Sequence, residues 1–238
     1  MEIITFTLQK SGEKKNDNQD SFKIDGKNKI LAISDGVSRS SFSNIWSKKI
    51  VEEFIKNPFQ TKTIDKIFLE KWLNPVKIHL DEEISKLDIN PMILDVAKEN
   101  GSSATFLGAQ IIKVKKQRKI SLWAVGDTNI FHIRQNKIHD SFPIKNLDGF
   151  TSRTFAINSF LDKNNIDFHY DEWSIKSGDV LILATDAFSH WFLDSYLKGQ
   201  RPWKKIIKKS GNMNEFIEKL RDAKKIENDD VTFIMIKY

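Results

Sequence analysis

The chain has 238 residues, of which 39% are hydrophobic, so it is long enough to form one large domain around a substantial core. It contains no cysteine, which excludes disulfides, zinc–thiolate sites and cysteine nucleophiles. The net charge of +6 would suit a nucleic-acid partner, but only six of the 38 basic residues are arginine, the side chain that makes bidentate contacts with phosphates and bases.

The lysine clusters and the apolar runs do not indicate nucleic acid or a membrane either. We predict that Lys113–Lys119 forms an exposed hairpin turn and that Lys204–Lys209 forms the polar face of a helix. The chain has no glycine-rich nucleotide loop. No apolar run is long enough to cross a bilayer, and the first residues lack the layout of a secretory signal. We therefore expect a cytoplasmic protein with no nucleic-acid partner and no membrane partner.

The first half of the chain begins with alternating apolar residues and continues with apolar residues at helical spacing. Pro75 lies inside the second helical segment, where we expect it to kink or interrupt the helix. The predicted elements are strands at 2–8, 20–24 and 30–35, a helix capped by Ser41 or Ser43 that runs through Phe54, and a helix over 64–87.

The second half begins with strands of period two, which we interpret as an antiparallel meander. The meander strands are predicted at 103–115, 119–126, 129–135 and 137–142. Residues 143–166 are irregular, and the remaining elements are strands at 167–174, 180–185 and 231–237 and helices at 187–197 and 212–224. No linker divides the chain, so this order predicts one domain over 1–238 with an α+β fold, a layered sandwich of antiparallel sheets and helices.

Four aspartates follow or end apolar runs: Asp35 in LAISDG, Asp127 in LWAVGDT, Asp186 in LILATDA and Asp229 in NDDVTFIMI. A carboxylate at the end of a buried strand is costly unless a positive charge meets it. Four such carboxylates predict one shared cation site, and hard oxygen ligands suit Mg²⁺ or Mn²⁺. Gly36 after Asp35 would let its own carbonyl approach an ion, although an Asp-Gly pair taken alone is more often a hairpin turn.

Six segments, in this order along nearly the whole chain, resemble the motifs of the metal-dependent type 2C protein phosphatases, the PPM family. They are NQDSF, ISDG, GSSATFLGAQI, WAVGDTNIFHIR, SGDVLILATDAF and DDVTFIMI. The resemblance is to the bacterial, stand-alone branch of that family. It implies an α-β-β-α sandwich, in which two antiparallel sheets are flanked by helices.

The resemblance also implies a site and an activity. Asp35 would bridge two Mg²⁺ or Mn²⁺ ions, Asp186 and Asp229 would complete the first, and the carbonyl of Gly36 would help to hold the second. Asp20 would orient water, and Asp127 would lie beside a third, weaker ion. The implied reaction is hydrolysis of phosphoserine and phosphothreonine in a protein substrate, by a monomer whose counterpart would be a cognate serine/threonine kinase.

Some residues depart from the family pattern. Gln19 replaces a glutamate near the second ion, and Lys15 replaces the arginine that binds the phosphate, a contact that Arg39 could supply instead. Asn129 replaces an arginine, and Ala187 replaces a glycine after Asp186. These changes leave a second hypothesis open, a pseudophosphatase that binds phosphoproteins without hydrolysing them.

The histidines provide no obvious general acid. We predict that His132 and His139 lie on the surface beside a turn. His190 follows Asp186 by one helical turn, and we favour a partly exposed helix residue over a residue at the metal site.

Overall fold

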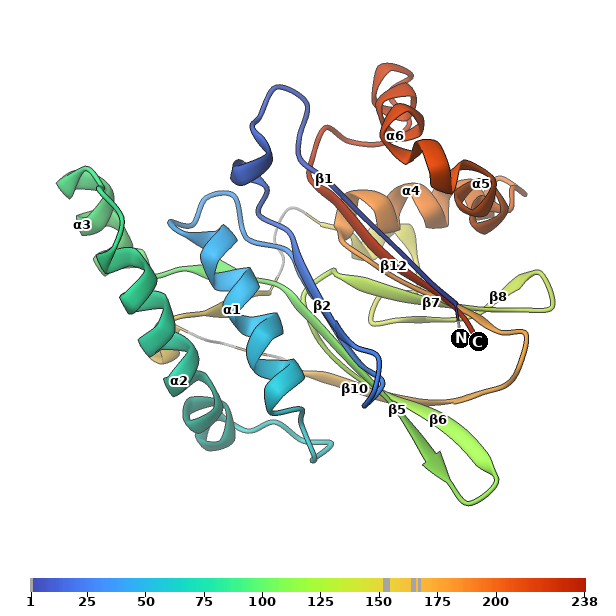
Figure 1. The fold of residues 1–238 in the computed structure, drawn as a ribbon, viewed down its shortest axis with the longest axis horizontal. Helices are drawn as coiled ribbons and strands as arrows, with labels where there is room; N and C mark the ends of the chain where they lie inside the picture. The colour runs from blue at the N-terminus through green and yellow to red at the C-terminus, as the bar shows by residue number, and fades with distance from the viewer. Residues whose placement is uncertain (1, 152–154, 164–165, 167) are drawn as a thin grey trace. The chain divides into compact units, whose positions relative to one another are not determined.

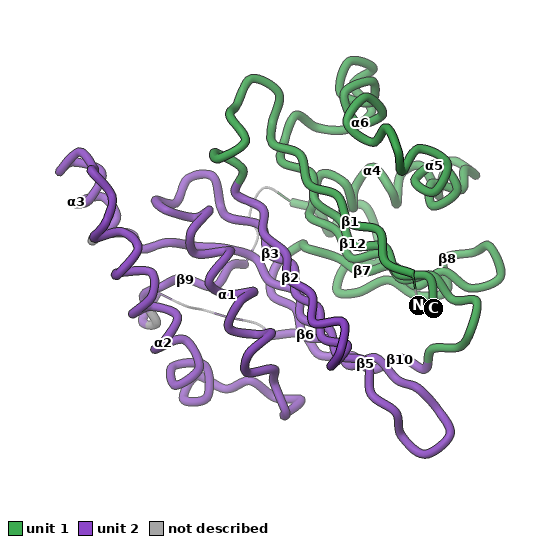
Figure 2. The backbone as a smooth tube through the Cα atoms, viewed as in Figure 1, with its two compact units in different colours: residues 1–18, 127–153, 175–238 green, residues 19–126, 154–174 purple. Residues whose placement is uncertain are grey.

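The computed structural model describes residues 2–151, 155–163, 166 and 168–238 (Figure 1). The chain divides into two compact units, each assembled from segments that are distant in sequence (Figure 2). Unit 1 comprises residues 1–18, 127–153 and 175–238, and unit 2 comprises residues 19–126 and 154–174. The prediction of a single catalytic domain over 1–238 stays a prediction.

Unit 1 contains a five-stranded sheet in the order β1-β12-β11-β7-β8. These strands are β1 (Glu2–Leu8), β12 (Val231–Lys237), β11 (Val180–Ala184), β7 (Asn129–Arg134) and β8 (Lys137–Phe142). Every neighbouring pair is antiparallel. The first and last strands of the chain therefore lie side by side, and the two termini meet at one end of this pair (Figure 1).

Helices pack on one face of this sheet through aromatic side chains. They are α4 (Asp186–Leu197), α5 (Pro202–Lys209) and α6 (Met213–Asp222). Phe188 of α4 stacks on Phe233 of β12 with ring centroids 4.6 Å apart, and both rings are fully buried. The buried face of α4 thus fixes the start of this helix against the centre of the sheet.

Unit 2 contains a second five-stranded sheet, in the order β10-β6-β5-β3-β2. Its strands are β10 (His169–Ile175), β6 (Gln117–Val125), β5 (Phe106–Val114), β3 (Ile30–Ser34) and β2 (Ser21–Asp25). The β2–β3, β3–β5 and β5–β6 pairs are antiparallel. All five residues of β3 are buried, which makes it a core strand of this unit.

The helices of unit 2 are α1 (Ser43–Lys56), α2 (Lys66–Ser85) and α3 (Pro91–Asn100). Their core joins Phe54 of α1 to Phe106 of β5, whose ring centroids lie 5.2 Å apart. Both units therefore have a helical layer on an antiparallel sheet, which confirms an α+β fold with two antiparallel sheets flanked by helices. No helix in the described ranges is both long enough and apolar enough to pass through a membrane.

The bounds of β1 and β12 match the predicted strands, and the exposed β5–β6 turn and the helix at 202–209 confirm the interpretation of both lysine clusters. The predicted cap of the first helix is wrong. The residue before α1 is Phe42, in a left-handed conformation (φ 54°), and neither Ser41 nor Ser43 caps the helix with its side chain. Pro75 does not interrupt α2, which continues through it. The irregular stretch 143–166 contains only short elements, among them a two-residue strand at Ile157–Asn158, and residues 152–154 and 164–165 of it lie outside the described part.

The predicted four-stranded meander is wrong. β5 and β6 form a hairpin in the sheet of unit 2, whereas β7 and β8 form a hairpin in the sheet of unit 1. The chain changes sheets at Gly126, which has a φ of 92°. A Cβ on Gly126 would lie 2.6 Å from the carbonyl oxygen of Phe155, so only glycine fits this turn. Strand periodicity shows which residues alternate, but it does not show which strand lies beside which.

Candidate metal-binding site

Three neighbouring strands of unit 1 end at one edge of their sheet, and an aspartate lies close to each of these ends. Ala184 of β11 pairs with Asn129 of β7 and with Phe233 of β12. Because both pairs are antiparallel, residues just before β7 and β12 lie at the same edge as residues just after β11. These residues are Asp127, Asp229 and Asp186. The strand register thus gathers three of the four aspartates that the sequence analysis singled out.

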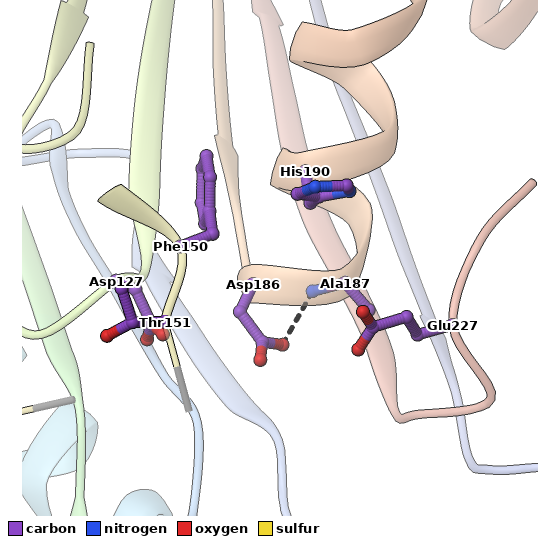
Figure 3. A pocket seen from close by; sticks show the side chains of 7 residues that line it. All are labelled: Asp127, Phe150, Thr151, Asp186, Ala187, His190 and Glu227. Atoms are coloured by element: carbon purple, nitrogen blue, oxygen red, sulfur yellow. Dashed lines mark hydrogen bonds between the residues drawn. The ribbon is translucent and has the colours of Figure 1, made fainter. Parts of the chain in front are cut away.

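A pocket of about 200 Å³ opens at this edge. Figure 3 shows the carboxylate of Asp186 between the side chains of Asp127 and Glu227, with His190 one turn further along α4. The pocket is lined by Asp127, Phe150, Thr151, Asp186, Ala187, His190 and Glu227. Three acidic residues in one pocket favour a cationic ligand over an anionic one.

Asp186 has a fixed position in this pocket. It is the first residue of α4, and its Oδ1 accepts a 2.6 Å hydrogen bond from the backbone N–H of Ala187. Thr185 before it is held by Thr232, because the N–H of Thr185 donates to the Thr232 carbonyl (3.1 Å) and the N–H of Thr232 donates to Oγ1 of Thr185 (3.1 Å). The carboxylate therefore stands at a helix N-terminus, where the helix dipole favours negative charge.

Burial and neighbouring negative charges raise the pKa of Asp186 from 3.8 to about 7. The neighbouring charges are those of Asp127, Asp229 and Glu227, and Asp127 is itself only 6% exposed. A divalent cation would remove this repulsion, and its preferred ligands are carboxylate oxygens such as these. In the ranges that the structure describes, no three His, Asp or Glu side chains form a complete metal site as they stand. The donor chemistry of unit 1 nevertheless fits Mg²⁺ or Mn²⁺.

Asp229 is partly exposed and is held by several groups. Its Oδ1 lies 3.0 Å from Nζ of Lys10 and accepts a 2.8 Å hydrogen bond from the N–H of Asp230. Its backbone carbonyl accepts a 2.6 Å hydrogen bond from Nη2 of Arg221 on α6. Contacts within unit 1 therefore fix the orientation of Asp229 and give its carboxylate a positive partner.

Asp35 lies directly after β3 in unit 2, where the backbone around it is bonded to Thr105. The N–H of Asp35 donates to Oγ1 of Thr105 (3.1 Å), and the N–H of Thr105 donates to the Asp35 carbonyl (2.8 Å). The next N–H, that of Gly36, donates to the carbonyl of Gln19 (3.1 Å). Unit 2 thus brings Asp35 and Gly36 close to the segment that contains Asp20, which is 9% exposed.

Gly36 is required by close packing, and the expectation that its carbonyl approaches an ion stays a prediction. Gly36 has no positive φ and does not lie in a hairpin turn, because it forms an isolated bridge with Ala104. A Cβ at this position would lie 2.7 Å from the carbonyl oxygen of Ser43 and 2.9 Å from that of Gln19. Close packing against the start of α1 therefore excludes any side chain at Gly36.

The residues expected to bind phosphate are exposed. Lys15 belongs to a short 3-10 helix, Lys15–Asp17, in unit 1, and Arg39 lies in the turn after β3 in unit 2. Gln19, which replaces the family glutamate, accepts a 2.8 Å hydrogen bond at Oε1 from the hydroxyl of Ser38. The roles of Lys15 and Arg39 stay predictions.

Comparison with solved structures identifies the fold. The chain is similar to the serine/threonine phosphatase PstP/Ppp of Mycobacterium tuberculosis, with a TM-score of 0.63 and 13% identity over 98% of this chain and 97% of that one. It is similar to the serine/threonine phosphatase Stp1 of Staphylococcus aureus, with a TM-score of 0.61 and 17% identity over 100% and 95% of the two chains. The chain has the fold of the PPM-type serine/threonine phosphatases. No protein-family model and no curated protein sequence matches it.

The phosphatase fold extends over the full length of this chain. A second structure of PstP, described in complex with two manganese ions, covers 98% of this chain with a TM-score of 0.59 and 13% identity. The photosystem II phosphatase PBCP covers 100% of it with a TM-score of 0.60 and 14% identity. At these identities the likeness concerns the fold alone.

Two residues near the pocket were not predicted from the sequence, and one residue elsewhere was predicted in the wrong place. Glu227 lines the pocket but follows no apolar run, and Lys10 pairs with Asp229 but is a single lysine after the first strand, with no local pattern that links it to Asp229. His190 is partly exposed, as expected, and also lines the pocket beside Phe150. His132 is not a surface residue: it is 1% exposed, and its Nε2 lies 2.9 Å from Asp179.

One departure from the family pattern has a structural explanation. Asn129, at the position of a family arginine, is fully buried. Its amide donates to the hydroxyl of Ser141 (2.8 Å), and its Oδ1 accepts from the N–H of Ile144 (2.9 Å). Asn129 therefore holds the turn that follows β8, a role that an arginine side chain would not fill at the same position.

Proposed function

We propose that this protein is a Mg²⁺- or Mn²⁺-dependent phosphatase that hydrolyses phosphoserine and phosphothreonine in proteins. The observation that carries the proposal is the strand register of unit 1, which gathers Asp127, Asp186 and Asp229 at one sheet edge. The match of the whole chain to phosphatase folds supports it independently. A cognate serine/threonine kinase would supply the phosphorylated substrate.

The proposed ligands are those that the family resemblance implies. Asp35 would bridge two ions, Asp186 and Asp229 would complete the first, and the Gly36 carbonyl would help to hold the second. Asp20 would orient the attacking water, and Asp127 would bind a third ion more weakly. The raised pKa of Asp186 supports this assignment, because a carboxylate under such repulsion gains most from a nearby cation.

Divalent ions supply two contributions to phosphate-ester hydrolysis: they activate water near neutral pH and they neutralise developing charge. The protein groups would hold the substrate and the water in place. Lys15 or Arg39 would bind the phosphate, Lys15 as a point charge and Arg39 with two donors. The backbone bonds around Thr185 and Thr105 keep Asp186 and Asp35 in position before substrate arrives.

The test is hydrolysis of an aryl phosphate and of a phosphothreonine peptide, measured with Mn²⁺ and with EDTA. We expect turnover only with the metal, and we expect Asp35→Asn and Asp186→Asn to abolish it. The matched control is Asp194→Asn, which removes a carboxylate that pairs with Lys198 (2.7 Å) on the same helix as Asp186. Turnover that persists in EDTA and in Asp35→Asn would refute the proposal.

The second candidate is a pseudophosphatase that binds a phosphorylated protein without hydrolysing it. The bond between Gln19 and Ser38 favours it, because the amide that replaces a carboxylate already has a protein partner. Phosphopeptide binding without release of phosphate, over a range of pH and Mn²⁺ concentration, would select this candidate over the first.

A further inference from the structure

Lys10 is anchored to the Asp229–Asp230 pair by both its backbone and its side chain. Its N–H donates a 2.9 Å hydrogen bond to Oδ1 of Asp230, and its Nζ lies 3.0 Å from Oδ1 of Asp229. The Lys10 side chain is only 19% exposed, although most lysines of this chain lie on the surface. Strand pairing fixes the register, because Leu8 at the end of β1 pairs with Val231 at the start of β12.

A second set of hydrogen bonds joins the segment after β1 to the segment before β12. The N–H of Ser11 donates to Oδ1 of Asn228 (2.9 Å), and Nη1 of Arg221 donates to the hydroxyl of Ser11 (3.2 Å). Arg221 is 9% exposed, and its Nη2 donates to the carbonyl of Asp229. The ammonium of Lys10 is therefore held beside Asp229 by a rigid framework.

Lys10 is not needed to orient the carboxylate that it contacts. The backbone of Asp229 is fixed by Arg221, and its Oδ1 accepts a hydrogen bond from the N–H of Asp230. What Lys10 adds is a positive charge at the carboxylate that is proposed to bind the first metal ion. A metal ion at Asp229 must either displace this ammonium or bind against its repulsion.

We propose that Lys10 is an internal counter-ion of Asp229 that competes with the divalent cation and thereby lowers the metal affinity of the site. This inference rests on the proposed function, since it assumes that Asp229 is a metal ligand. Lys10 acts on the ion only through its charge beside Asp229, and it takes no part in the chemical step.

The proposal predicts that removing Lys10 strengthens metal binding, a direction that structural damage would not produce. Mn²⁺ binding to the full chain is measured by isothermal titration calorimetry. We expect Lys10→Met and Lys10→Gln to bind Mn²⁺ roughly five- to tenfold more tightly, as expected for loss of one partly exposed charge pair and of its repulsion. Lys10→Gln keeps a hydrogen-bond donor to Asp229 and serves if Lys10→Met fails to fold.

Two control variants test whether any change in Mn²⁺ affinity comes from the loss of positive charge at Lys10. Lys10→Arg keeps the positive charge, and we expect its affinity to stay within about twofold of the wild type. Lys237→Met removes a lysine that pairs with Glu2 at the same 3.0 Å distance, near the opposite end of β12, and we expect no change. At about 3.3 Å per residue, the length of β12 puts this pair roughly 20 Å from the start of the strand, at the end away from Asp229.

The outcomes distinguish this inference from the function on which it rests. If the wild type binds no Mn²⁺, the proposed function fails and the counter-ion role fails with it. If the wild type binds Mn²⁺ but Lys10→Met and Lys10→Gln bind it equally or more weakly, the counter-ion role alone is overturned. Tighter binding by both variants, with Lys10→Arg unchanged, supports it.

Discussion

Replacing Asp186 by asparagine should stabilise the metal-free protein, although it abolishes the proposed activity. The pKa of this carboxyl is raised from 3.8 to about 7 by burial and by the charges of Asp127, Asp229 and Glu227. At about 1.4 kcal/mol per pKa unit, the shift limits the cost of ionising it in the folded state to about 4 kcal/mol. Partial exposure to solvent screens the charge, so we expect a gain of about 2 kcal/mol. The substitution preserves shape, and Oδ1 of asparagine can still accept the hydrogen bond from Ala187.

The pH dependence of this gain has a definite sign. Below pH 3.8 Asp186 is protonated in both the folded and the unfolded protein, so asparagine brings no electrostatic gain. Between pH 3.8 and about 7 the folded state binds more protons than the unfolded state, so the wild type loses stability as pH rises. Above about pH 7 the cost is fully present. The difference between Asp186→Asn and the wild type should therefore grow from pH 4 to pH 8.

The assay is thermal unfolding in EDTA and in Mn²⁺, at pH 4 and pH 8. For a chain of this size about 2 kcal/mol corresponds to roughly 4–8 °C, so Asp186→Asn should unfold at a higher temperature in EDTA at pH 8. In Mn²⁺ the wild type should instead unfold at the higher temperature, because a metal at 100 times its dissociation constant stabilises the wild type by about 2.7 kcal/mol. Asp194→Asn on the same helix should show neither effect. A variant less stable than the wild type in EDTA at pH 8, or a difference independent of pH, would refute the reasoning.

Three further predictions follow from packing and charge. Gly36→Ala should cost about 1–3 kcal/mol in urea unfolding, because its Cβ would meet the Ser43 carbonyl at 2.7 Å, and an unchanged midpoint would contradict the packing argument. Glu227→Gln should raise the melting temperature in EDTA and weaken Mn²⁺ binding a few-fold in calorimetry, since it removes one negative charge near Asp186. Asp179→Asn should lower stability at pH 7 by about 3 kcal/mol, because it leaves Arg134 without its buried carboxylate, and the loss should shrink below pH 3.

Features of the fold that depend on local sequence could be predicted, and those that depend on distant pairing could not. The strands β1 and β12 were predicted with their observed bounds because each is a local pattern: β1 alternates between more and less exposed residues, and β12 is a mostly apolar run that is buried from Val231 to Ile236. The assignment of β6 and β7 to different sheets depends on contacts between segments far apart in sequence. The helix α3 received no prediction, although Asn90 and Pro91 at its start are typical N-terminal signals.

The candidate site shows the same division. Asp127, Asp186 and Asp229 were found because each lies beside a buried strand, which is a local property. Lys10 could not be found in this way, because its partner Asp229 lies 219 positions later and no local pattern links them. Glu227 is an exposed residue in a polar turn, and only its place beside Asp186 gives it significance.

The two ends of β11 carry aspartates whose pKa values are shifted in opposite directions. Burial would raise the pKa of Asp179, but hydrogen bonds from Arg134, from the N–H of Lys176 and from His132 outweigh it and lower the pKa to about 2. Asp186, at the other end, meets carboxylates instead, and its pKa rises to about 7. A carboxylate with several buried donors around it stabilises the fold, whereas one with a single backbone donor and several like charges near it is retained at a cost that a bound cation can offset. In EDTA at pH 8, Asp179→Asn and Asp186→Asn should therefore change stability with opposite signs, and equal losses would show that both aspartates are structural.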